Sequence, residues 1–175
     1  NKPRSRNILF LQGYVTPVKN QGSCGSCWAF AAVASMEAAH FEKYGTTLQM
    51  SEQQVVDCDT RNSGCNGGWY DTAWKYVNGE GGIETQADYP YTGRDGTCKA
   101  GNNDFVSNVD GCHGGPNFYC PGHGLVGDEA ELEKMLNDRP VAVAVDVDVS
   151  VFRDVVVVVV DVVIVVVVVV GVVFL

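Results

Sequence analysis

The sequence has little positive charge and little histidine. Its 175 residues include 12 lysines and arginines against 21 aspartates and glutamates, which gives a net charge of −9. This acidic balance argues against nucleic acid or an anionic membrane as a partner. Its histidines are His40, His113 and His123, so any mechanism that needs an imidazole can draw on only these.

The sequence also lacks a signal segment and an internal repeat. Residues 1–6 lead into no long apolar run of the kind that a secretory signal contains, so we expect a mature, already processed form. At this length the chain can bury a core as one domain or as two small ones.

Residue variety is missing near the end of the sequence. From residue 155 to residue 170 only Asp161 and Ile164 interrupt a run of valine. A β-branched homopolymer would aggregate. A membrane anchor is the alternative, but it would hold Asp161 at high cost inside the bilayer. We therefore interpret valine here as standing in for other residue types, and we expect no membrane partner.

The most informative segment is QGSCGSCWAF, residues 21–30. It places Cys27 after a tight turn that Gly25 permits, at the start of a helix. The apolar positions of that helix are Phe30, Val33, Ala34, Met36, Ala38 and Phe41. A thiol at a helix N-terminus lies at the positive end of the helix dipole, which favours the nucleophilic thiolate. Cys27 is therefore a candidate catalytic nucleophile.

Two other interpretations of these cysteines remain. Cys24 and Cys27 could form a thioredoxin-type redox pair, although no βαβ pattern precedes them. They could also be structural, or ligate zinc together with Cys58 and Cys65, but the spacing is atypical of a zinc ribbon.

The number of cysteines is odd. Seven cysteines indicate a disulfide-bearing protein from an oxidising or lysosome-like compartment, with one thiol left free. Cys112 and Cys120 lie near His113 and His123, but their irregular spacing does not favour a metal site. We expect no metal and no other cofactor.

Helical signals dominate the first half of the sequence, and strand signals follow. The expected helices cover residues 27–44, 51–58 and 69–77. A capping box of Ser51 with Gln54 opens the second helix, and Asn78-Gly79 ends the third. Residues 141–149 have the apolar alternation of a strand. This order predicts an α+β protein with two subdomains.

Several segments resemble the papain family of cysteine proteases. The nucleophile segment reads CGSCW, as that family does near its mature N-terminus. Further matching strings follow the family order: VTPVKN at 15–20, SEQQVVDC at 51–58, CNGG at 65–68, YPY at 89–91 and PVAVAV at 140–145. The resemblance covers roughly residues 13–154.

The resemblance implies a papain-like fold of two domains with the active-site cleft between them. Residues 14–110 would form the mainly helical left domain that carries the nucleophile. Residues 111–175 would begin a β-barrel-like right domain, near which residues 1–13 pack. The chain is expected to be truncated within this second domain.

The resemblance further implies a cysteine endopeptidase that works through a thioester acyl-enzyme. Cys27 would attack the scissile carbonyl group, and the Gln21 side chain and the Cys27 backbone N–H would form the oxyanion hole. The residues matching the family's substrate-binding positions are Gly67, Gly68, Trp69, Tyr70 and Ala144. An alternative for Trp69 and Trp74 is a place in the core of their helix.

The catalytic base is the main departure from the family. That family has its histidine about 130–150 residues after the nucleophile, where this sequence has none. An ungapped count from Pro140 puts the histidine position at Val170, followed by the family-like Gly171-Val172-Val173. If the base is truly absent, the alternative is an inactive protease-like protein that binds or stores peptides.

The resemblance also implies how the cysteines pair. Cys24 would bond to Cys65 and Cys58 to Cys98, while Cys112 and Cys120 bond to each other or to a cysteine beyond residue 175. The expected partners are polypeptide substrates, a propeptide and protein inhibitors. We expect a secreted or lysosomal or vacuolar monomer.

Overall fold

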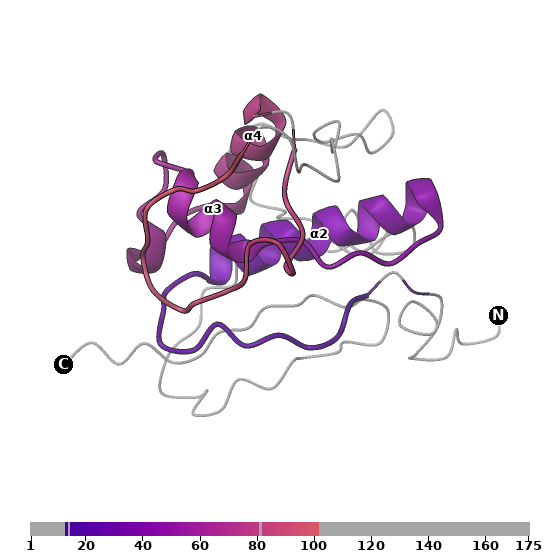
Figure 1. Cartoon of the computed structure of the whole chain (residues 1–175), viewed down its shortest axis with the longest axis horizontal. Coiled ribbons are helices and arrows are strands. Elements are labelled where there is room, and N and C mark those ends of the chain that lie inside the picture. Colours follow the sequence, from indigo (N-terminus) through magenta and orange to yellow (C-terminus); the bar gives the residue numbers. More distant parts are fainter. Residues whose placement is uncertain (1–12, 14, 81, 102–175) are drawn as a thin grey trace, which may run out of the picture.

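Three helices make up most of the described part of the chain. The computed structural model describes residues 13, 15–80 and 82–101. Its elements are α2 (Cys27–Tyr44), α3 (Glu52–Cys58), the 3-10 helix η1 (Gly64–Asn66) and α4 (Tyr70–Glu80). In Figure 1, α3 and α4 lie on the same side of the long α2, and the indigo segment before α2 runs along it before turning into its start. An isolated antiparallel bridge joins Met50 and Thr85.

Helix α2 ends where the sequence predicts. Gly45 has a φ of +68°, a left-handed conformation that costs glycine little, and its N–H donates to the carbonyl oxygen of Phe41 at 2.8 Å. The expected stop after Tyr44 is confirmed.

Helix α3 has only half of the predicted capping box. The Ser51 hydroxyl accepts from the Gln54 N–H at 2.9 Å, as expected. However, the Ser51 N–H donates to the Glu84 carbonyl at 3.0 Å instead of to the Gln54 side chain. That buried amide accepts from the Glu84 N–H at 2.7 Å and donates to the Tyr76 hydroxyl at 3.2 Å. The predicted bond from the Ser51 N–H to the Gln54 side chain is therefore wrong, because the backbone of Glu84 bonds to both groups instead.

Helix α4 continues through Asn78-Gly79 and ends at Glu80, so the predicted end is wrong. An isolated helical glycine costs only about 1 kcal/mol relative to alanine. Burial of Tyr76 and Val77 on the core side supports the helix beyond this point. The Gly82 N–H then donates back to the Val77 carbonyl at 3.0 Å, which closes the helix end.

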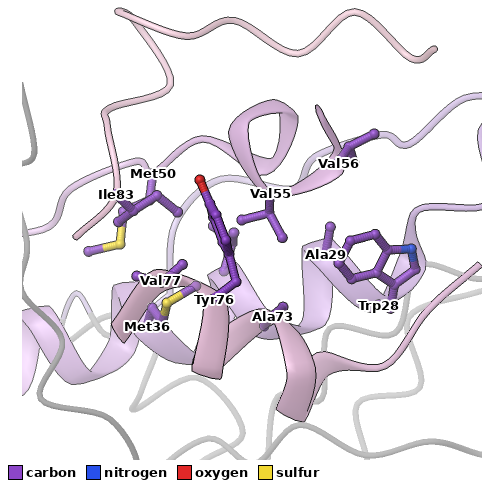
Figure 2. Close-up of a cluster of buried hydrophobic side chains, with 12 residues drawn as sticks. Trp28, Ala29, Met36, Met50, Val55, Val56, Ala73, Tyr76, Val77 and Ile83 are labelled. Carbon is purple, nitrogen blue, oxygen red and sulfur yellow. The ribbon is translucent and has the colours of Figure 1, made fainter. Parts of the chain in front are cut away.

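The core lies where the three helices meet. Figure 2 shows side chains from α2, α4 and the segment around Ile83 pointing toward one another, with Trp28 at one end. The buried cluster consists of Trp28, Ala29, Ala32, Val33, Met36, Met50, Val55, Val56, Ala73, Tyr76, Val77 and Ile83. Trp74 packs against this cluster, whereas Trp69 is 50% exposed. The core interpretation therefore holds for Trp74 and is wrong for Trp69, which lies just before the first residue of α4.

A buried ionic cluster ties the segment before α2 to the helices. Lys19 Nζ lies 2.5 Å from Glu37 Oε1 and 2.5 Å from Glu52 Oε1. Glu37 also accepts from the Thr16 hydroxyl at 2.5 Å and from the Met50 N–H at 2.8 Å. Burial raises the pKa of Glu52 above its ordinary value, although Lys19 acts in the opposite direction. The cluster fixes the path that the chain takes toward Cys27.

The second predicted domain, residues 111–175, lies outside the described residues, as do the strand at 141–149 and the valine run. No described helix combines the length and the apolar character needed to cross a membrane.

Candidate active site

Cys27 is the first residue of α2, and its thiol is free and exposed. The other cysteines of the described part form the disulfides Cys24–Cys65 and Cys58–Cys98. These are the two pairings that the resemblance implied, and they leave Cys27 available for chemistry.

Gly25 makes the turn before Cys27 possible through close packing. Its N–H donates to the Cys65 carbonyl at 2.9 Å, and a Cβ atom built on it would lie 2.5 Å from that oxygen. Only glycine fits so close to another backbone. The Ser26 N–H then donates to the Cys24 carbonyl at 2.8 Å, which turns the chain into the start of α2.

The surroundings of the thiol oppose its ionisation. Partial burial raises the pKa of Cys27, while hydrogen bonds from the backbone N–H groups of Trp28 and Cys27 lower it by less. The helix start therefore favours the thiolate, as the sequence suggested, but desolvation outweighs it. A positive charge beside the sulfur would offset this desolvation.

Gln21 is buried beside the turn. Its Nε2 donates to the Cys24 carbonyl at 2.9 Å, and its Oε1 is buried with no hydrogen-bond partner among the described residues. An amide nitrogen carries two hydrogens. One of them holds the side chain against the turn, so the other remains for a ligand.

A short ledge of backbone, Gly67-Gly68-Trp69, lies beside the start of α2. Gly67 has a φ of +114°, which favours glycine, and its carbonyl accepts from the Ser63 N–H at 3.0 Å. The Asn62 side chain holds both backbone groups of Trp69: it accepts from its N–H at 2.8 Å and donates to its carbonyl at 3.2 Å. Among the described residues, the Gly68 N–H and carbonyl have no partner.

Trp28 joins this ledge to the nucleophile. Its indole nitrogen donates to the Gly64 carbonyl at 3.1 Å. A Cβ atom on Gly68 would lie 2.8 Å from the indole and 2.5 Å from Asn62 Oδ1. Because Trp28 follows Cys27 directly, the ledge is packed against the helix turn that presents the thiol.

Two aromatic side chains, Trp69 and Tyr70, come directly after Gly68. Trp69 is exposed, whereas Tyr70 is half-buried and its ring centroid lies 5.2 Å from that of Trp74. Half of the Trp69 surface is thus accessible to solvent, whereas Tyr70 packs against the core.

His40 does not lie near the thiol. It is thirteen residues after Cys27 on the same helix, which corresponds to about 20 Å at 1.5 Å per residue. Its ring lies 4.6 Å from that of Tyr44. Burial, and then the charge of Lys43, lower the pKa of His40, which favours the neutral ring.

Several predicted residues lie outside the described residues: Ala144, Val170, Cys112, Cys120, His113 and His123. Within the described part, no group of three or more histidine, cysteine, aspartate or glutamate residues could hold a metal ion. The sequence analysis gave no role to Asn62, because a side chain that bonds to backbone seven residues away leaves no periodic signal.

Comparisons with known proteins agree with this geometry. The profile described as "Papain family cysteine protease" matches residues 3–163. Zingipain-1 from Zingiber officinale is 42% identical over 142 residues, 81% of this chain and 60% of that protein. Digestive cysteine proteinase 2 from Homarus americanus is 40% identical over 147 residues, 81% of this chain and 42% of that protein. The chain thus spans less than two thirds of the length of these relatives.

Solved structures give the same answer. The proform of Amb a 11, a cysteine protease and ragweed pollen allergen, is 46% identical, with a TM-score of 0.56 over 58% of this chain and 32% of its own. Digestive procathepsin L2 from Tenebrio molitor larval midgut is 42% identical, with a TM-score of 0.57 over 59% of this chain and 33% of its own. The described part therefore has the papain-like fold, and the chain belongs to the papain family of cysteine proteases.

Proposed function

We propose that the protein is a cysteine endopeptidase that hydrolyses peptide bonds through a thioester acyl-enzyme. The observation that carries this proposal is the free, exposed thiol of Cys27 at the start of α2, beside the buried amide of Gln21 and the ledge at Gly68. A nucleophile, an oxyanion donor and a backbone-pairing edge are the parts that acyl transfer to a peptide requires.

In this reaction the Cys27 sulfur bonds to the scissile carbonyl carbon. The Gln21 amide and the Cys27 N–H receive the oxyanion that forms. The carbon–nitrogen bond then breaks, and the amine leaves with a proton from an imidazolium. Water adds to the thioester and gives a proton to the imidazole, and the carbon–sulfur bond breaks to release the acid.

The imidazole is assigned to position 170, across a cleft between two domains. Residues 14–110 would be the helical domain and 111–175 the start of the β-rich one, near which residues 1–13 pack. The raised pKa of Cys27 supports this proposal, since an imidazolium beside the thiolate would offset the desolvation. We expect protein sequencing to find histidine, rather than Val170, at this position.

The substrate would lie extended along the ledge. The Gly68 N–H and carbonyl, which have no partner among the described residues, can pair with one residue of a peptide backbone, and Gly67 leaves room for its approach. Trp69, Tyr70 and Ala144 would line an apolar pocket for the second residue before the scissile bond.

Partners and compartment follow from the same reasoning. The two similar solved structures are a proform and a procathepsin, which supports a propeptide as a partner beside polypeptide substrates and protein inhibitors. Two disulfides in the described part support an oxidising compartment, secreted or lysosomal or vacuolar. We further propose a monomer, and a third disulfide between Cys112 and Cys120.

A thiol-directed irreversible inhibitor tests the function. We expect it to label Cys27 alone in the unreduced protein and to abolish peptidase activity with one-to-one stoichiometry. The competing candidate is a peptide-binding or storage protein without turnover, which would apply if residue 170 is a true valine. Labelling of Cys27 in a protein that binds peptides but never cleaves them would establish that candidate instead.

A further inference from the structure

Tyr91 reaches the candidate active site from a distant part of the sequence. It follows α4 and lies 65 residues from Ser26 and 70 from Gln21 along the chain. Its half-buried ring meets the Phe30 ring edge-on, with centroids 4.9 Å apart and planes at 83°. This contact seats the phenol against the first turn of α2.

The hydroxyl of Tyr91 contacts two segments at once. It donates to the main-chain carbonyl of Gln21 at 2.8 Å and lies 2.7 Å from the Ser26 hydroxyl oxygen. A phenol has a single proton. Because that proton is directed at Gln21, the Ser26 hydroxyl must be the donor in the second bond.

This arrangement explains an unusual helix start. Ser26 is the N-cap residue of α2, a position where serine normally accepts from a backbone N–H, yet its side chain makes no such bond. The Ser26 hydroxyl is fully buried and is directed to Tyr91 instead. The N–H groups of Cys27 and Trp28 are thus left free of a side-chain cap, facing the thiol.

The two contacts of Tyr91 belong to the two halves of the proposed oxyanion hole. One half is the side chain of Gln21, and Tyr91 donates a hydrogen bond to the main-chain carbonyl of that residue. The other half is the N–H of Cys27, and Tyr91 accepts a hydrogen bond from the hydroxyl of Ser26, the residue just before Cys27. We infer that Tyr91 is a positioning residue that sets the spacing between these two oxyanion donors. This inference rests on the function proposed above.

Tyr91 is itself held in place independently of its hydroxyl. On one side, the Ser51 hydroxyl donates to the Tyr89 carbonyl at 2.7 Å. On the other, the Thr92 N–H donates to Gln53 Oε1 at 2.7 Å. Both anchors come from the start of α3, so a Tyr91→Phe variant keeps the loop and the ring and loses only the two hydroxyl bonds.

The test compares reactions that need the oxyanion hole with one that does not. For Tyr91→Phe we expect kcat per alkylatable Cys27 to fall about tenfold, less than the 10²–10³ lost when a donor is removed, with KM within about twofold. A peptide aldehyde, whose adduct places an oxyanion in the hole, should bind about tenfold more weakly. The rate of alkylation by iodoacetamide, which forms no oxyanion, should stay unchanged.

Tyr89→Phe is the matched control. It removes a hydroxyl two residues away that donates to Asp57 Oδ2 at 2.8 Å and touches neither Gln21 nor Ser26. We expect its kcat and aldehyde affinity to match the wild type. Ser26→Ala removes the bond between Ser26 and Tyr91 and keeps the bond from Tyr91 to Gln21, so it should show the same pattern with a smaller loss, even if Tyr91→Phe folds poorly.

The outcomes separate this inference from the proposed function. If the wild type shows no turnover but Tyr91→Phe still weakens aldehyde binding, the inference stands and the endopeptidase proposal fails. If the wild type is active and neither Tyr91→Phe nor Ser26→Ala changes kcat or aldehyde affinity, the inference is overturned. An equal loss of alkylation and turnover in both variants also overturns it, since that indicates general damage.

Discussion

Cys24 and Cys65 are joined by a disulfide three residues before the nucleophile and two residues before the ledge glycine Gly67. The bridge therefore couples the two backbone segments that meet at the candidate active site. The second bridge, Cys58–Cys98, joins the end of α3 to the loop that contains Cys98 and does not involve the segments on either side of Cys27.

The two disulfides allow a matched experiment because they close loops of almost equal length, 41 and 40 residues. Each should contribute about 4 kcal/mol to stability through the unfolded chain. We expect the double variants Cys24→Ser/Cys65→Ser and Cys58→Ser/Cys98→Ser to lose similar free energies of unfolding in urea. Under conditions where both double variants are folded, only Cys24→Ser/Cys65→Ser should also have a lower kcat. Equal kcat losses would show that the first bridge has no special role at the site.

Position 170 should control the ionisation of Cys27. If a recombinant chain is made with the valine that the sequence shows at 170, burial keeps the Cys27 pKa above its ordinary value of 9.0, so the alkylation rate should reach half its maximum above about pH 9. In Val170→His the midpoint should fall below about pH 7, and peptidase activity should appear. When His40→Gln is added to Val170→His, the alkylation midpoint and the peptidase activity should stay unchanged, because His40 lies at the far end of α2. A midpoint that does not move in Val170→His would contradict the assignment.

Asn62 should affect substrate binding rather than the chemical step. In Asn62→Ala both backbone groups of Trp69 lose their side-chain partner, and the ledge loses its fixed shape. We expect KM for a peptide substrate to rise about tenfold with kcat within about twofold, the pattern of lost uniform binding. Arg61→Ala is the control, since the half-exposed Arg61 contacts Asp59 and not the ledge. A fall in kcat at constant KM would refute this role.

Trp69 and Trp74 should behave differently although they are five residues apart. Trp69 is exposed beside the ledge, so Trp69→Ala should weaken the preference for apolar or aromatic side chains at the second residue before the scissile bond. The Trp74 indole donates to the Ala32 carbonyl at 3.2 Å and lies against the core, so Trp74→Ala should cost about 3–5 kcal/mol of stability and leave that preference intact. A peptide library gives the preference. An arginine or lysine preference in the wild type would rule out the apolar pocket.

Glu52 should make the protein less stable as pH rises. Its folded-state pKa lies above the ordinary value of 4.5, so the folded state binds the proton more tightly than the unfolded state. The resulting stability is fully present below pH 4.5 and is lost as pH rises through the folded pKa. In urea titrations from pH 4 to pH 7, the wild type should lose stability relative to Glu52→Gln. Glu80→Gln controls for the removal of one surface carboxylate.

The sequence was most informative where structure depends on neighbouring residues. The stop at Gly45 and the Ser51 cap each depend on residues within four positions, so their signals are visible in a single segment. The cysteine pairing came from the resemblance, because spacing alone leaves several connectivities open.

The sequence was least informative where one side chain satisfies distant backbone. Gln54 binds Glu84 thirty residues away, and Tyr91 binds Gln21 across seventy, and neither bond has a periodic signature. The sequence indicated only one of the effects that set the ionisation of Cys27, for a related reason. The helix dipole is a local effect, whereas desolvation depends on everything that packs around the thiol.

The Asn62 amide occupies the place that a neighbouring β-strand would take beside Trp69. By satisfying that N–H and carbonyl, it blocks strand-to-strand addition at this ledge and leaves a single residue, Gly68, open for pairing. For the endopeptidase proposed above, an exposed edge would be a place where extended segments of partly unfolded chains could join and nucleate aggregates. Among the described residues, the side chain of one asparagine would limit such pairing to the length of one residue, so that an extended segment would be held by few backbone bonds and released.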